Sequence, residues 1–135
     1  MRTKHFNLYE LVPEREYNSV PHHILWMQLD NRLLKAIDHL REKWGVMVGN
    51  TWKWGGNYQN RGWRNGWGSR FSQHYSGRAQ DLEPSENSVD VVRNDIISNP
   101  QDYPFITEIE LEVSWLHVGC RNLPPGFKGL YKFKP

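Results

Sequence analysis

The chain has 135 residues, of which 38% are hydrophobic and 24% are charged, and its formal net charge is +2. This length is typical of one domain with its own hydrophobic core, so we expect a single domain over residues 1–135. The small net charge does not indicate a nucleic-acid-binding protein, and the single cysteine, Cys120, excludes an intramolecular disulfide.

The start of the chain carries cations but lacks the run of about 7–15 apolar residues that a secretory signal requires. No apolar stretch reaches the length of a transmembrane helix, so we expect no membrane span. We therefore expect a protein made in the cytoplasm without a signal peptide. If its substrate lies outside the membrane, another factor must release the protein.

The first third of the chain predicts mainly helix. Residues 5–11 indicate a short strand or an extended lead-in, and the polar residues 14–20 indicate a loop. Across residues 21–44, apolar side chains recur at spacings of three, four and seven, which is typical of an amphipathic helix. This helix could be divided in two, with Asp30 or Asn31 capping the second part.

The middle of the chain predicts a strand at residues 46–52 and then a long irregular loop at residues 53–71. The loop is rich in Gly and Asn and contains several aromatic residues, namely Trp54, Tyr58, Trp63, Trp67 and Phe71. From Lys53 to Arg78 there are five cations and no acid. These residues form either a solvated loop or a site for an anionic group such as a carboxylate.

The last third predicts strands around one helix. Residues 78–83 and 114–120 are strand-like, residues 88–98 form an amphipathic helix, and residues 105–113 mostly alternate as in a half-buried strand. Residues 127–133 suit an edge strand. The expected fold class is therefore α+β, with two main helices and a small, mainly antiparallel sheet.

Three residues in this arrangement are candidate metal ligands. His74 and Asp81 lie seven positions apart, and His117 follows on a later predicted strand. Two imidazoles and one carboxylate leave one tetrahedral position of Zn²⁺ open for water, as in catalytic zinc sites. We expect one Zn²⁺ per chain, although each of these residues alone would more often be structural.

The surrounding residues strengthen this interpretation. Ser72-x-His74-x-x-Gly77-x-Ala79-x-Asp81 resembles the S-x-H-x-x-G-x-A-x-D motif of the zinc D-Ala-D-Ala carboxypeptidase family, in particular its small phage and bacterial members. Two further segments are similar to this family. They are Trp115-Leu116-His117-Val118, which resembles the second metal motif, and Gly62-Trp63-Arg64, which resembles a Gly-aromatic-Arg segment upstream of the first.

The resemblance covers roughly residues 30–121. It implies a Hedgehog/DD-peptidase-like fold and a zinc peptidase that hydrolyses peptide bonds involving D-amino acids in peptidoglycan stem peptides. It implies that Arg64 meets the substrate carboxylate or the developing oxyanion, with Arg70 and Arg61 as rivals for that role. Ser72 and Trp115 are further candidates for contact with the substrate. Such a protein would act at the cell wall after release from the cytoplasm.

The family's general base is not present at its usual place. The family has a Glu three residues before the last His, where this chain has Ser114, and some small members have an Asp where this chain has Gly119. We expect Glu112 to replace the base, with Glu110 and Glu108 further from His117 along the same predicted strand. Alternatively, these acids form the solvated face of that strand.

Three functions therefore remain open. The first is a zinc-dependent peptidase of the D,D or L,D type, acting as a carboxypeptidase or an endopeptidase. The second is a non-catalytic member of the same fold that binds metal and either the cell wall or a partner protein. The third, which we do not favour, is a nucleic-acid-binding module that uses the Arg and Trp side chains of residues 52–71.

Overall fold

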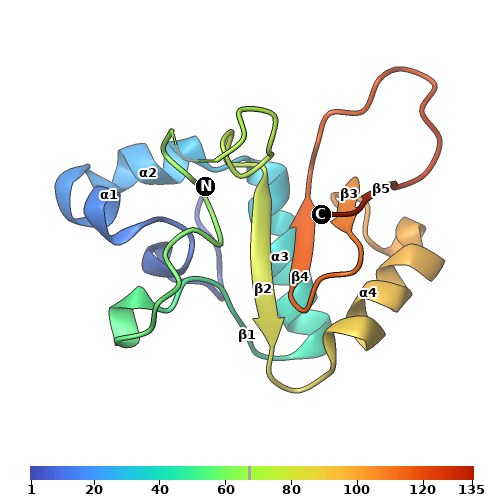
Figure 1. Cartoon of the computed structure of the whole chain (residues 1–135), viewed down its shortest axis with the longest axis horizontal. Helices are drawn as coiled ribbons and strands as arrows, with labels where there is room; N and C mark the ends of the chain where they lie inside the picture. Colours follow the sequence, from blue (N-terminus) through green and yellow to red (C-terminus); the bar gives the residue numbers. More distant parts are fainter. Residues whose placement is uncertain (67) are drawn as a thin grey trace.

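The computed structural model describes residues 1–66 and 68–135, which form four α-helices and a five-stranded sheet (Figure 1). The helices are α1 (Glu14–Ser19), α2 (His22–Gln28), α3 (Asn31–Trp44) and α4 (Val89–Ser98). The strands are β1 (Met47–Val48), β2 (Ala79–Pro84), β3 (Glu108–Glu110), β4 (Leu116–Gly119) and β5 (Tyr131–Phe133). Short 3₁₀ helices cover Leu8–Glu10, Trp52–Trp54 and Pro100–Asp102. The predicted α+β class is confirmed, but these residues form four α-helices where two main helices were expected.

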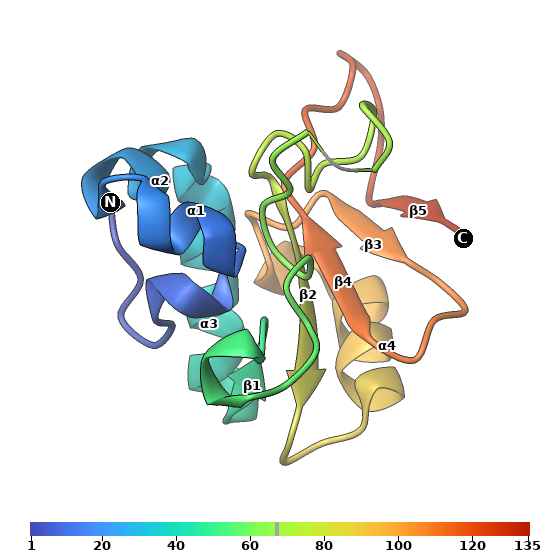
Figure 2. The ribbon, with the colours of Figure 1, turned by 60° about the vertical axis from the view of Figure 1, so that its left-hand side comes forward.

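The sheet has the strand order β1-β2-β4-β3-β5. Three neighbouring pairs are antiparallel, whereas β5 runs parallel to β3, so the sheet is mixed. Figure 2 shows β2, β4 and β3 side by side, with β5 beyond β3 near the C-terminus. The expected edge strand at residues 127–133 is therefore present as β5, although only its last part is paired.

Alternation along the strands gives the sheet two different faces. On one face, Leu82 lies opposite Leu116, and both belong to the core that the sheet shares with the helices. On the other face, Asp81 lies directly opposite His117. Helix α3 contacts β2 and helix α4 contacts β4. Packing of the apolar face therefore fixes which side chains the opposite face presents.

The helices form the apolar layer of this core. In α3, buried residues recur on one side of the helix, including Leu33, Ile37 and Leu40. The helix starts where the Asp30 side chain accepts a hydrogen bond of 2.9 Å from the backbone N–H of Arg32. Of the two alternatives for residues 21–44, the divided helix is therefore correct. None of the described helices is long and apolar enough to cross a membrane.

Two local predictions were wrong, and a third was right only in part. Residues 14–20 were expected to be a loop, but Glu14–Ser19 form α1, a helix of 6 residues that is too short to show a clear apolar period. Residues 5–11 contain the 3₁₀ helix Leu8–Glu10 rather than a strand. Of residues 105–113, only Glu108–Glu110 pair as a strand. The loop at residues 53–71 starts within Trp52–Trp54, and Trp67 lies outside the described residues.

Gly77 joins the loop that carries His74 to the helical layer. Its φ is +73°, and a Cβ there would lie 2.0 Å from the carbonyl oxygen of Gln28. Its own carbonyl accepts a hydrogen bond of 3.0 Å from the backbone N–H of Asp30.

We expect Gly77→Ala to lower the free energy of unfolding by about 2–4 kcal/mol, because it adds both strain and overlap. Urea unfolding beside Gly66→Ala checks this, since Gly66 also has positive φ but, among the described residues outside its chain neighbours, no atom within 4 Å of its would-be Cβ. An equal loss in both variants would contradict the role of the close contact.

Candidate metal centre

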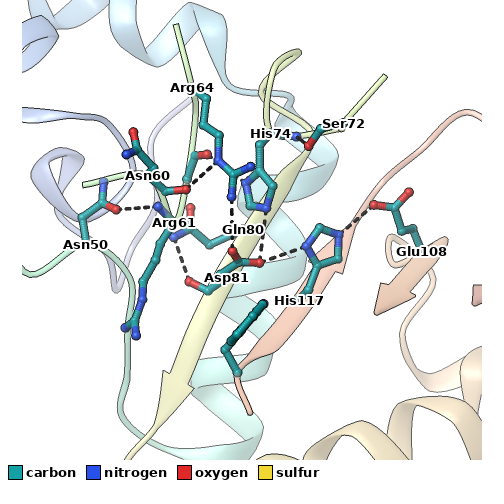
Figure 3. Close-up of polar contacts among 12 residues, drawn as sticks. Asn50, Asn60, Arg61, Arg64, Ser72, His74, Gln80, Asp81, Glu108 and His117 are labelled. Atoms are coloured by element: carbon teal, nitrogen blue, oxygen red, sulfur yellow. Dashed lines mark hydrogen bonds and ion pairs between the residues drawn. The ribbon is translucent and has the colours of Figure 1, made fainter. Parts of the chain in front are cut away.

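Three buried side chains converge on the sheet face opposite the core. Asp81 is on β2, His117 faces it from β4, and His74 comes from the loop that leads into β2 (Figure 3). Their exposed fractions are 7%, 3% and 3%, respectively. The sequence pattern around residues 72–81 therefore brings its two candidate ligands together, and the strand register supplies the third.

The distances between the donor atoms suit a metal ion. Asp81 Oδ1 lies 3.2 Å from His74 Nε2 and 2.9 Å from His117 Nδ1. One donor atom from each residue lies within 4.8 Å of the other two. Ligands about 2.0–2.1 Å from a tetrahedral zinc ion are ~3.3 Å apart, so small adjustments would complete such a shell. This group could therefore hold a metal ion.

The hydrogen bond made by Nδ1 of His74 determines the role of Nε2, the nitrogen that faces Asp81. His74 Nδ1 lies 2.9 Å from the carbonyl oxygen of Gly62 and must donate its proton to that oxygen. In a neutral imidazole, Nε2 then carries a lone pair that faces the Asp81 carboxylate. Two acceptors in contact require a cation between them, either a proton or a metal ion. The donor set could thus hold a metal ion in the place of that proton.

His117 is held in the same way by Glu108 on β3. His117 Nε2 lies 2.7 Å from Glu108 Oε1, and the second oxygen of Glu108 accepts a hydrogen bond from Arg121. Glu108 is itself 1% exposed. A carboxylate behind a ligating histidine fixes the ring orientation and strengthens the ligand. Nδ1 of His117 is therefore the nitrogen directed at the shared centre with Asp81.

The charges of this cluster are strongly coupled. Burial acts to lower the pKa of His117, yet the carboxylates of Asp81 and Glu108 raise it to about 9. Burial acts to raise the pKa of Asp81, but hydrogen bonds from His117 and His74 hold it well below its ordinary value. Asp81 is thus a carboxylate at neutral pH, and His117 carries a proton that a metal ion must displace.

Arg64 borders this cluster. Its Nη2 lies 3.6 Å from Asp81 Oδ2, and its Nε donates a hydrogen bond of 2.8 Å to the carbonyl of Asn60. The Arg64 backbone N–H also donates to the carbonyl of His74 at 3.1 Å. The guanidinium group is therefore fixed beside the candidate ligands, where it could contact an anionic group.

The three ligands open onto a cavity of about 260 Å³. Its lining residues are Arg64, Ser72, His74, Asp81, Glu110, Trp115, His117 and Phe133. A second cavity of about 370 Å³ shares Arg64, Asp81 and Trp115 with the first and extends along residues 57–61. Candidate ligands at the wall of a polar cavity would leave access for a further ligand of a bound metal ion.

The other predicted site residues divide into two groups. Ser72 and Trp115 line the cavity beside the ligands, whereas Arg70 is exposed and is not among the residues that line either cavity. Arg61 lines the larger cavity, but it hydrogen-bonds Gly49 and Glu83 and stacks on Tyr58.

Glu112 lies away from the metal ligands. Its side chain is 64% exposed and forms an ion pair of 3.2 Å with Lys134. Its backbone has a φ of 60°, in the left-handed region that residues other than glycine seldom adopt. Glu112, which we expected to replace the family's general base, is not among the residues that line either cavity. Ser114 lines only the larger cavity.

Sequence reasoning did not assign roles to Glu108 and Phe133, which contact the centre. The Phe133 ring meets the His117 ring edge to face, with centroids 5.3 Å apart. Glu108 pairs with Gly119 across the strands, and a Cβ on Gly119 would lie 3.1 Å from Glu108 Oε1. The glycine thus leaves room for the glutamate. The alternation of residues 105–113 placed Glu108 on the polar face of the strand. It did not predict which residue of β4 would lie opposite Glu108.

Comparisons with protein-family models, with curated proteins and with solved structures found no significant match for this chain. The geometry of the centre and the motif that carries its candidate ligands are therefore the features of this chain that indicate a function.

Proposed function

We propose that this protein is a zinc-dependent peptidase that hydrolyses peptide bonds involving D-amino acids in peptidoglycan stem peptides. The observation that carries the proposal is the convergence of His74, Asp81 and His117 on one buried centre that opens onto a cavity. The proposed substrate class depends on the resemblance of residues 72–81 to the zinc D-Ala-D-Ala carboxypeptidase motif. The Hedgehog/DD-peptidase-like fold, which we also propose, depends on the same resemblance.

Two imidazole nitrogens and one carboxylate oxygen favour zinc over magnesium or calcium, which prefer oxygen ligands. His74 Nε2, Asp81 Oδ1 and His117 Nδ1 would hold the ion. When bound, zinc would lower the pKa of a water molecule and polarise the substrate carbonyl. The described chain contributes three ligands to this site, which leaves one tetrahedral position for that chemistry.

The cavities supply the contacts that orient a peptide. Arg64 is in place to bind a substrate carboxylate or to stabilise negative charge on the carbonyl oxygen during attack. The larger cavity continues from Arg64 past the amide side chains of Asn57, Gln59 and Asn60. Amides can donate to and accept from a peptide backbone. We therefore place the peptide in the two joined cavities, with Trp115 on the wall common to both.

The buried Glu108 provides a test of how the metal is held. We expect Glu108→Gln to weaken zinc binding about 10–100-fold, because the carboxylate behind a ligating histidine strengthens that ligand. A competitive chelator titration measures the affinity. Glu83→Gln is the matched control, since Glu83 is on β2 but is exposed and pairs with Arg61. Equal zinc affinity of both variants and wild type would contradict the role of Glu108.

The proposed function itself is tested by metal content and hydrolysis. We expect purified protein to contain about one zinc per chain, to cleave a defined set of muropeptides, and to lose both properties in His74→Ala. His23→Ala, which removes an exposed imidazole, should retain them. Full zinc occupancy in His74→Ala would overturn the site. Zinc without cleavage of any muropeptide would favour the non-catalytic alternative, in which the same centre serves binding to the cell wall or a partner.

The proposed substrate also implies where the protein acts. Peptidoglycan lies outside the cytoplasmic membrane, so we propose that the protein acts at the cell wall after release from the cytoplasm.

A further inference from the structure

One acidic side chain in the ligand cavity has no role in holding the metal. Glu110 is the last residue of β3 and lines the same cavity of about 260 Å³ as His74, Asp81 and His117. Glu108 and Glu110 are two positions apart on one strand, so both project from the sheet face that carries the ligands. The intervening Ile109 is fully buried in the core on the opposite face.

The Glu110 carboxylate is available for chemistry. Among the described residues, no hydrogen bond or ion pair engages its side chain, in contrast to Glu108, which is held by both His117 and Arg121. Arg64 lines the same cavity; burial lowers its pKa, and the negative charges of Asp81 and then Glu110 act against that effect. Glu110 is half-buried, so it remains accessible from the cavity.

The other acids near the centre are already engaged. Asp81 is a ligand, Glu108 is fully buried behind His117, and Glu83 lines the larger cavity while paired with Arg61. Glu112 is on the surface with Lys134. Of the acids that line the ligand cavity, Glu110 is thus the one that neither coordinates the centre nor supports a ligand.

We propose that Glu110 is the general base of the hydrolytic reaction, an inference that rests on the proposed function. Its carboxylate takes a proton from the attacking water as the water oxygen bonds to the substrate carbonyl carbon. It then gives that proton to the leaving nitrogen as the C–N bond breaks, which yields a carboxylic acid and an amine; the acid then passes its remaining proton to the amine or to water. Glu110 thereby takes the role for which Ser114 is unsuited. The base is thus on β3, the strand that pairs with β4, and not on β4 itself, which carries His117.

The test separates proton transfer from metal binding. We expect Glu110→Gln to contain as much zinc as wild type and to bind intact muropeptide, measured by calorimetry, within about threefold of the wild-type KM. Its kcat should fall about 10²–10⁴-fold, which is the usual contribution of a general base. Glu110→Asp should recover part of the lost rate. Glu14→Gln, a change of the same type at an exposed site far from the cavity, should behave as wild type.

Each other outcome overturns the proposal. If wild type cleaves and Glu110→Gln cleaves equally well, Glu110 is not the base and the peptidase function stands. If Glu112→Gln loses the rate instead, the surface acid has the role. If Glu110→Gln loses zinc, Glu110 belongs to the metal site. If wild type carries zinc but cleaves no muropeptide, the peptidase function fails and the proposal with it.

Discussion

Replacement of Asp81 by asparagine is expected to abolish zinc binding at micromolar zinc and to destabilise the zinc-free protein by about 3–5 kcal/mol. Asp81 Oδ1 is shared by His74 and His117, and Oδ2 faces Arg64. Asparagine keeps the shape but removes the negative charge that these groups require. Loss of one partner of a buried charged cluster is costly because the remaining charge stays desolvated.

Two measurements check this expectation. A chelator competition gives the zinc affinity, which should fall by more than the ~10–100-fold expected from loss of a supporting residue. Urea unfolding of the zinc-free protein gives the stability. Asp90→Asn is the matched control, because the Asp90 side chain is 83% exposed in its ion pair with Arg93. Because the Asp90 carboxylate is exposed to solvent, loss of its charge is expected to cost about 0–1 kcal/mol. A loss of stability no greater than that of Asp90→Asn would show that Asp81 is not the centre of the charged cluster.

The same cluster shows which parts of the site could be predicted from sequence. His74, Asp81 and Gly77 belong to one short motif, so their spacing is local and readable. His117 and Arg64 were found through similar short segments. These predictions required no knowledge of which strands pair. The structure brings the three candidate ligands and Arg64 together.

Glu108 and Glu110 illustrate what the sequence could not supply. Their alternation with Ile109 indicated a polar face, but a polar face is equally compatible with solvent. Only the pairing of Glu108 with Gly119 and of β5 with β3 turns that face toward the ligands. Strand register depends on contacts distant in sequence. The preference for Glu112 followed from distance along the chain to His117, which is not the distance across the sheet.

The fold was predictable to a similar degree. The capping residue Asp30 and the apolar side of α3 are local signals, and they gave the divided helix as one of two alternatives. Helix α1 has 6 residues, fewer than two turns, so its stability depends on packing rather than on an apolar period. Strand β5 pairs parallel to β3 through residues at the end of the chain, which no local pattern indicates.

Zinc affinity is expected to increase about tenfold for each pH unit between pH 6 and pH 8. His117 must lose its proton to bind the metal through Nδ1, and the flanking carboxylates raise its pKa to about 9. Below that pH, zinc and the proton compete for the same nitrogen. Calorimetric titrations at pH 7 in two buffers with different ionisation enthalpies should therefore report release of about one proton from His117.

The stability of the zinc-free protein should decrease as the pH rises, whereas the zinc affinity increases. Since the pKa of His117 is higher in the folded than in the unfolded protein, protonation stabilises the fold. This contribution is complete below about pH 6.5, the unfolded value, and is lost as the pH rises through about 9. Zinc-free protein should thus become less stable over the range in which zinc binds more tightly. In Glu108→Gln, which retains only Asp81 beside His117, both changes should move to lower pH. A zinc affinity that is independent of pH between 6 and 8 would show that His117 is already neutral before zinc binds.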